Sequence, residues 1–106
     1  MLHKETIEIV RHYLRSLSRE KIPVSKAIVF GSHARGYAAP ESDIDLLLVS
    51  PLFDKGVEEY VGTLWLLTRD SGYRIEPIPV GEQRYNTDDV STIIEVARRE
   101  GVEVSE

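Results

Sequence analysis

The sequence contains no cysteine, which excludes disulfide bonds and thiolate metal sites. It also lacks a long apolar run. The longest, residues 44–49, is interrupted by Asp45 and falls far short of the ~20 apolar residues that a transmembrane helix needs. The first five residues, Met-Leu-His-Lys-Glu, include an acid and do not resemble a signal peptide. We therefore expect a cytoplasmic protein with no membrane partner.

Positive charge is also scarce: 13 Lys and Arg stand against 18 Asp and Glu, which gives a net charge of −5. A protein that grips nucleic acid through its phosphates needs a basic surface, because counterion release supplies much of the affinity. The composition therefore disfavours a long RNA or DNA substrate. The 106 residues, 42% of them hydrophobic, suit one domain over residues 1–106.

Hydrophobic periodicity predicts an α/β (α+β) fold, with a small mixed sheet of about three strands flanked by helices. Helices are expected where apolar residues recur every three or four positions, and strands where short apolar runs lie between glycines and prolines. The predicted order is helix 2–19, strand 26–30, a helical turn in 31–36, loop 37–42, strand 43–49, helix 57–68, strand 73–80 and helix 90–97, with a short tail strand suggested at 102–104. Thr87-Asp88-Asp89 is expected to cap the last helix, and Gly101 to end it.

Two of these strands have distinctive patterns. Strand 43–49 is apolar on both faces beyond its acids, which is typical of a central strand covered on both sides. Strand 73–80 contains Pro77 and Pro79, which have no amide hydrogen to donate, so it is expected at an edge of the sheet.

The residues that suggest chemistry begin with Asp43 and Asp45. Alternate residues of a strand share a face, so both carboxylates point the same way. Two neighbouring carboxylates repel each other unless a cation lies between them, and hard divalent ions such as Mg²⁺ take oxygen ligands. A lone Asp-x-Asp also fits an exposed strand start, so the motif alone does not decide between these interpretations.

Gly31-Ser32 adds a second constraint. A glycine at the end of a strand lets the backbone turn and approach an anion closely, and Ser32 then begins a helical turn whose first amides are suited to phosphate. The two strand ends would meet, with a triphosphate over the glycine turn and a metal over the acids.

Gly31-Ser32-His33-Ala34-Arg35-Gly36, followed by Ser42-Asp43-Ile44-Asp45-Leu46-Leu47-Leu48-Val49, resembles the signature of the nucleotidyltransferase superfamily. It is most similar to the minimal nucleotidyltransferases (MNT), the antitoxin partners of HEPN toxins. Kanamycin nucleotidyltransferase and the polymerase β superfamily are more distant. The resemblance is close over residues 27–49 and looser over the rest of the chain.

The resemblance implies a nucleotidyltransferase fold and phosphoryl transfer assisted by one or two Mg²⁺ ions, with ATP as the donor. Asp43 and Asp45 would bind metal, together with a third acid on a later strand. Glu76 is the matching candidate, although family members often carry Asp there; the alternative is an exposed strand Glu. Gly31, Ser32 and Arg35 would bind the triphosphate, and Arg35 could equally be an ordinary surface residue.

The resemblance also implies a partner. The acceptor would be a tyrosine hydroxyl of a cognate HEPN ribonuclease toxin, silenced by addition of AMP. The alternative is a binding module that neutralises the toxin stoichiometrically, and antibiotic nucleotidylation is a weaker third reading. An apolar face on residues 57–68, with Leu64, Trp65 and Leu67, is expected to dock the partner; a homo-oligomer is left open.

The remaining histidines and aromatic residues carry weaker expectations. His33 is expected to face solvent rather than to act in catalysis. Tyr60 and Trp65 are expected in the core or facing a partner, and Tyr37 and Tyr85 in loops.

Overall fold

The computed structural model describes residues 2–36, 42–72 and 74–106. The elements follow one another as α1 (Lys4–Arg19), β1 (Lys26–Phe30), α2 (Ser32–Arg35), β2 (Ile44–Ser50), η1 (Pro51–Lys55), α3 (Glu58–Leu66), η2 (Leu67–Ser71), β3 (Ile75–Gly81), α4 (Glu82–Thr87), α5 (Thr92–Glu100) and β4 (Val102–Glu103), where η marks a 3₁₀ helix. No helix in these described ranges is both long enough and apolar enough to span a membrane.

The sheet has four strands in the order β3-β2-β1-β4, one more than the three expected. β2 is parallel to β3 and antiparallel to β1, and β1 is antiparallel to β4, so the sheet is mixed as predicted. The suggested tail strand is real: it pairs Val29 with Val102, and the Val104 amide extends the pairing to the carbonyl of Ala27. β3 lies at one edge of the sheet, as Pro77 and Pro79 predicted.

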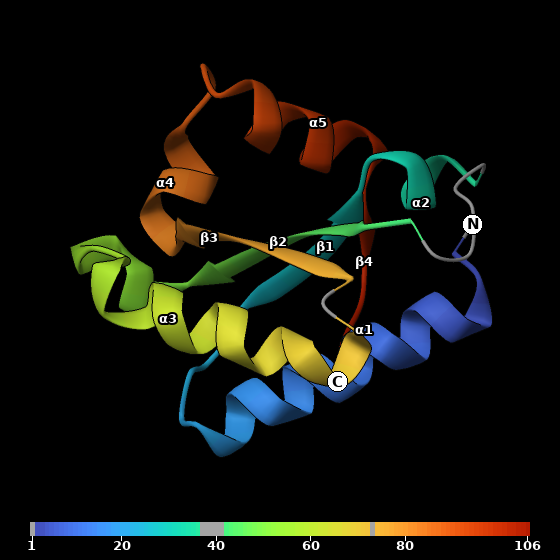
Figure 1. Cartoon of the computed structure of the whole chain (residues 1–106). Helices are drawn as coiled ribbons and strands as arrows, with labels where there is room; N and C mark the ends of the chain where they lie inside the picture. The colour runs from blue at the N-terminus through green and yellow to red at the C-terminus, as the bar shows by residue number, and fades with distance from the viewer. Residues whose placement is uncertain (1, 37–41, 73) are drawn as a thin grey trace.

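Helices cover both faces of the sheet, with α1 and α3 on one side and α5 on the other (Figure 1). Side chains of β2 therefore enter two separate cores. Leu46 and Leu48 pack in the larger core with α1 and α3, whereas Leu47 and Val49 pack in the smaller core with α5. The prediction of a central strand covered on both faces is confirmed.

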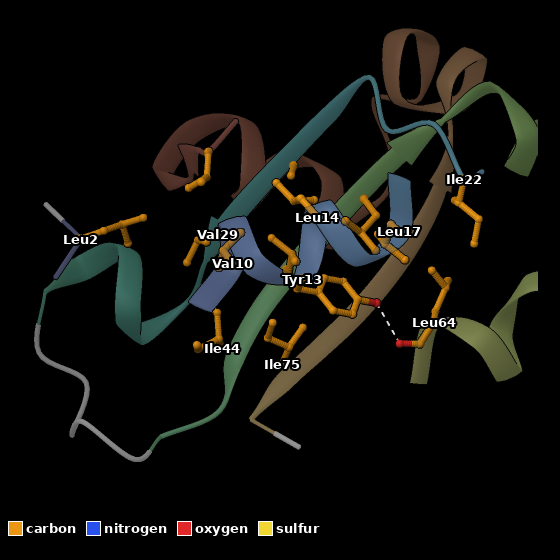
Figure 2. Close-up of a cluster of buried hydrophobic side chains, with 14 of the residues drawn as sticks. Leu2, Val10, Tyr13, Leu14, Leu17, Ile22, Val29, Ile44, Leu64 and Ile75 are labelled. Atoms are coloured by element: carbon orange, nitrogen blue, oxygen red, sulfur yellow. Dashed lines mark hydrogen bonds between the residues drawn. The ribbon is translucent and has the colours of Figure 1, made fainter. Parts of the chain in front are cut away.

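Tyr13 of α1 connects the two helices that cover the larger core. Its ring is buried, and its hydroxyl donates a hydrogen bond of 2.8 Å to the carbonyl of Leu64 in α3 (Figure 2). Burial raises the pKa of this phenol well above its usual range, so Tyr13 keeps its proton. The hydrogen bond to the Leu64 carbonyl offsets the cost of burying the hydroxyl at the helix contact.

The apolar face predicted on the second long helix is only partly correct. Leu64 is 1% exposed and faces the core, so it is not available to a partner. The exposed apolar side chains are Val61, Trp65 and Leu66 instead. Leu64 was misassigned because a nine-residue helix with apolar residues around most of its circumference does not reveal its buried face by periodicity alone.

The prediction for the C-terminal part was wrong at the start of the last helix. Residues 82–87 form the separate helix α4, and the Ser91 side chain caps α5 by accepting a hydrogen bond from the Ile94 amide. Val90, predicted on the buried stripe, is 86% exposed. Tyr85 lies on α4 rather than in a loop, with the Arg98 guanidinium 4.9 Å from its ring centre, while Tyr37 lies outside the described residues. Gly101 ends α5 as expected.

Candidate active site

The three predicted acids lie where neighbouring strands of the sheet begin. Asp43 immediately precedes β2, and Asp45 is the second residue of that strand. In the parallel ladder, Asp45 is paired in register with Glu76, the second residue of β3. Since β2 and β3 start at the same edge of the sheet, residues 31 positions apart in the sequence become neighbours.

The carboxylates of this group interact with one another. The pKa of Glu76 is raised above its ordinary value, first by a hydrogen bond shared with Asp45, then by partial loss of solvent, and further by the negative charges of Asp45 and Asp43. Like charges at close range disfavour the ionised state, so Glu76 holds a proton more strongly than an isolated glutamate. Binding of either a proton or a metal cation would reduce the repulsion among these carboxylates.

Gly31 lies against one of these acids, Asp45. Phe30, the last residue of β1, is paired with Asp45, and Gly31 follows at the start of α2. Gly31 has φ +75°, and a β-carbon there would collide with a carboxylate oxygen of Asp45. The backbone conformation therefore favours glycine, and any larger residue here would have to displace the Asp45 carboxylate. The predicted meeting of the Gly-Ser turn with the Asp-x-Asp strand is seen in the structure.

These residues suit a hard divalent cation. Asp43, Asp45 and Glu76 supply only carboxylate oxygens, and their mutual repulsion is the condition that such an ion removes. Within the described part of the chain, no three His, Cys, Asp or Glu side chains are already close enough together to hold a metal ion. Metal binding by these acids thus stays a prediction. It is supported by their carboxylate oxygens and by the raised pKa of Glu76.

Arg35 ends the short helix α2 and contacts an acid. Its Nε donates a 3.0 Å hydrogen bond to Glu100 of α5, and this pairing lowers the pKa of Glu100. About two-fifths of the Arg35 side chain is exposed. Phosphate binding by Arg35 remains a prediction, and Glu100 is a competitor for the guanidinium that the sequence pattern did not reveal.

The structure contradicts the prediction for His33. It was expected to face solvent, but it is 4% exposed, with its ring between Thr6 of α1 and the carbonyl of Ser42. No local signal in the sequence could have shown this, because its neighbours lie 27 and 9 positions away. Arg74, next to β3, was also missed; it forms an ion pair with Glu5 of α1.

Comparison with known families agrees with this geometry. The sequence profile described as "Nucleotidyltransferase domain" matches residues 7–99, which is most of the chain and includes the Gly-Ser turn and all three acids. The chain belongs to the nucleotidyltransferase domain family. The general class of reaction is therefore nucleotidyl transfer.

A solved structure resembles this nucleotidyltransferase domain over nearly its whole length. It is a protein from Sulfolobus solfataricus, provisionally assigned to the nucleotidyltransferases, with 19% sequence identity and a TM-score of 0.53. The match covers 92% of this chain and 77% of the other. At this identity the likeness shows a shared fold. None of the curated proteins compared with the chain matches it.

Proposed function

We propose that this nucleotidyltransferase domain transfers AMP from Mg²⁺-ATP to a tyrosine hydroxyl of a HEPN toxin and so acts as its antitoxin. The observation that carries the catalytic part is the group of three interacting acids beside Gly31-Ser32. The identity of the donor and of the partner rests on the resemblance of the motif to the MNT antitoxins.

Each residue has a distinct role in this proposal. Asp43, Asp45 and Glu76 would hold Mg²⁺, which when bound neutralises charge on the triphosphate and activates the hydroxyl. The turn at Gly31-Ser32 would hold the phosphates through its first amides, which precede the hydrogen-bonded part of α2.

The transfer itself is a substitution at the α-phosphorus of the donor. The tyrosine oxygen forms a bond to that phosphorus, the bond to the bridging oxygen of the β-phosphate breaks, and pyrophosphate leaves with the electron pair. The hydroxyl proton passes to the carboxylate of Glu76.

A protein substrate is supported by the exposed surface of α3. Val61, Trp65 and Leu66 are exposed on this helix, and their side chains offer apolar area for contact with a second protein. The same surface is compatible with the alternative function, a module that neutralises a toxin by binding it without modification.

Intact-mass spectrometry separates the two functions. The protein encoded next to this one is incubated with the domain, Mg²⁺ and each nucleoside triphosphate in turn. We expect a mass increase of one or more AMP groups with ATP, abolished by Asp43→Ala and retained by Asp89→Ala, which removes an exposed acid outside the site. A tight complex with an unmodified partner, equally protective with Asp43→Ala, would establish the binding module instead.

A further inference from the structure

His33 connects three segments of the chain at the edge of the candidate active site. It belongs to α2, packs against Thr6 of α1, and reaches the residue that precedes Asp43. Both His33 and Thr6 are at least 96% buried, at 4% and 3% exposed. A buried imidazole with two specific neighbours is a fixed part of the structure, yet the proposed chemistry assigns it no role.

The direction of the two contacts follows from the atoms involved. The Ser42 carbonyl oxygen can only accept, so His33 Nε2 carries a hydrogen and donates it over 3.0 Å. With the hydrogen on Nε2 of a neutral ring, Nδ1 is an acceptor, and the Thr6 hydroxyl, 3.4 Å away, can donate to it. The first contact is the shorter and stronger of the two.

The Ser42 contact matters because of where Asp43 lies in the chain. Asp43 is outside the ladder of β2, which begins at Ile44, and its side chain is exposed. On its C-terminal side, the chain is fixed by the Ile44 amide, which donates to the Arg74 carbonyl over 2.7 Å. On its N-terminal side, the chain is fixed by the hydrogen bond from His33 Nε2 to the Ser42 carbonyl. The backbone is therefore hydrogen-bonded on both sides of Asp43. The Ile44 amide bonds to another backbone group, whereas the Ser42 carbonyl bonds to the side chain of His33.

We propose that His33 is a positioning residue for Asp43: through the Ser42 carbonyl it fixes the backbone that aims the Asp43 carboxylate at the metal site. The inference rests on the proposed function insofar as it assigns Asp43 to metal binding. Groups one shell outside a metal ligand contribute to affinity by orienting the ligand, and their loss typically weakens binding about 10–100-fold.

The test is Mn²⁺ binding, with free Mn²⁺ counted by electron paramagnetic resonance below the melting temperature of every variant. His33→Gln keeps an N–H near the position of Nε2, whereas His33→Asn is too short to reach the Ser42 carbonyl. We expect His33→Asn to raise the Kd for Mn²⁺ about tenfold and His33→Gln to stay within about twofold of wild type. His12→Asn, the same change at an exposed histidine of α1, should leave the Kd unchanged.

A second variant protects the test against loss of folding. His33→Leu occupies much of the ring's space without donating a hydrogen bond, and it should weaken Mn²⁺ binding as His33→Asn does. The inference is overturned if either variant, folded by circular dichroism, binds Mn²⁺ as tightly as wild type, or if His33→Gln is as weak as His33→Asn. Lowered melting temperatures with unchanged Kd would mean that His33 serves only stability.

The outcome is independent of the partner experiment. Weakened Mn²⁺ binding in His33→Asn together with an unmodified partner would remove the proposed function and leave the positioning role of His33 intact. A modified partner together with wild-type Mn²⁺ affinity in His33→Asn and His33→Leu would do the opposite.

Discussion

The two parts of β2 have opposite character. Asp43, the residue before the strand, is exposed, and Asp45, its second residue, is half-buried. A hydrogen bond with Asp45, and further the charges of both aspartates, raise the pKa of the neighbouring Glu76. From Leu46 to Val49, every side chain is at most 1% exposed and packs in one of two cores. One seven-residue strand thus joins an electrostatically unfavourable cluster to the most deeply buried segment of the molecule.

Together with the proposed function, this difference leads to the hypothesis that activity depends on the acids at the start of the strand and stability on its apolar part. Clustered carboxylates cost folding free energy, and that cost persists because the adjacent apolar residues stabilise the strand by burial. Changes at the acidic start should therefore affect chemistry and spare stability, and changes in the apolar part should do the reverse. Six substitutions, grouped in four tests, examine this contrast and its surroundings.

The largest expected effect is that of Asp45→Asn. The change removes a proposed metal ligand and should lower the rate of nucleotidyl transfer roughly a thousandfold, which corresponds to several kcal/mol of lost transition-state stabilisation. The melting temperature should hold or rise, because Glu76 loses a repelling neighbour. Initial rates from mass spectrometry and a thermal scan measure both. A large fall in melting temperature would show that the acidic start also stabilises the fold.

Leu47→Ala tests the apolar part of the strand. Leu47 has no exposed surface, so its truncation should lower the free energy of unfolding by about 2–5 kcal/mol. Val61→Ala, at an exposed position of α3, should change it by less than about 0.5 kcal/mol. Urea denaturation gives both values. The contrast fails if Leu47→Ala, while still folded, also loses Mn²⁺ affinity.

Glu100→Gln tests whether Glu100 competes with the triphosphate for the guanidinium of Arg35. It weakens the ion pair with Arg35 and should lower the KM for ATP by no more than about fivefold, since an exposed pair contributes about 0–1 kcal/mol. Arg35→Ala should raise the same KM. Steady-state kinetics at low and moderate salt measure both. If Arg35→Ala leaves the KM unchanged, Arg35 is a surface residue and its role in phosphate binding is wrong.

The smallest expected effect is on the pH dependence of stability. It involves Asp88, whose pKa is lowered, whereas that of Glu76 is raised. Amides of Ser91 and Val90, then Arg84, lower the pKa of Asp88 to about 2. A pKa below the unfolded value means that Asp88 stabilises the fold above about pH 4 and that this stability is lost as the pH falls toward 2. Asp88→Asn should lose less melting temperature between pH 5 and pH 2 than wild type. Parallel curves would show that Asp88 does not contribute.

Much of the fold was accessible from the sequence because its signals are local. Apolar periodicity located α1, β1, β2 and α3 to within a few residues, and the prolines of β3 identified an edge strand. The six-residue helix α4 has no buried residue and therefore no apolar stripe to announce it. The start of α5 was misplaced because Thr87, Asp88 and Ser91 are all good capping residues, and only packing decides among them.

The acids of the site were predictable because spacing and strand order place them. Asp43 and Asp45 share a motif, and the family pattern led to Glu76, which the structure pairs in register with Asp45; the roles of all three acids stay predictions. The surroundings were not predictable, since they depend on contacts distant in sequence. The burial of His33 depends on Thr6, and the orientation of Arg35 depends on Glu100, 65 positions away.

Pro77 and Pro79 have one more consequence. They pair in register with Leu46 and Leu48, and being two positions apart they present their missing donors to the same side of β3. Since β3 forms its ladder with β2 on the inner side, the donors are missing on the outer side. If a strand from another molecule paired with this outer edge of β3, two of its carbonyl groups would have no amide hydrogen to accept. The prolines therefore hinder another strand from extending the sheet next to Glu76 and protect this edge against edge-to-edge aggregation.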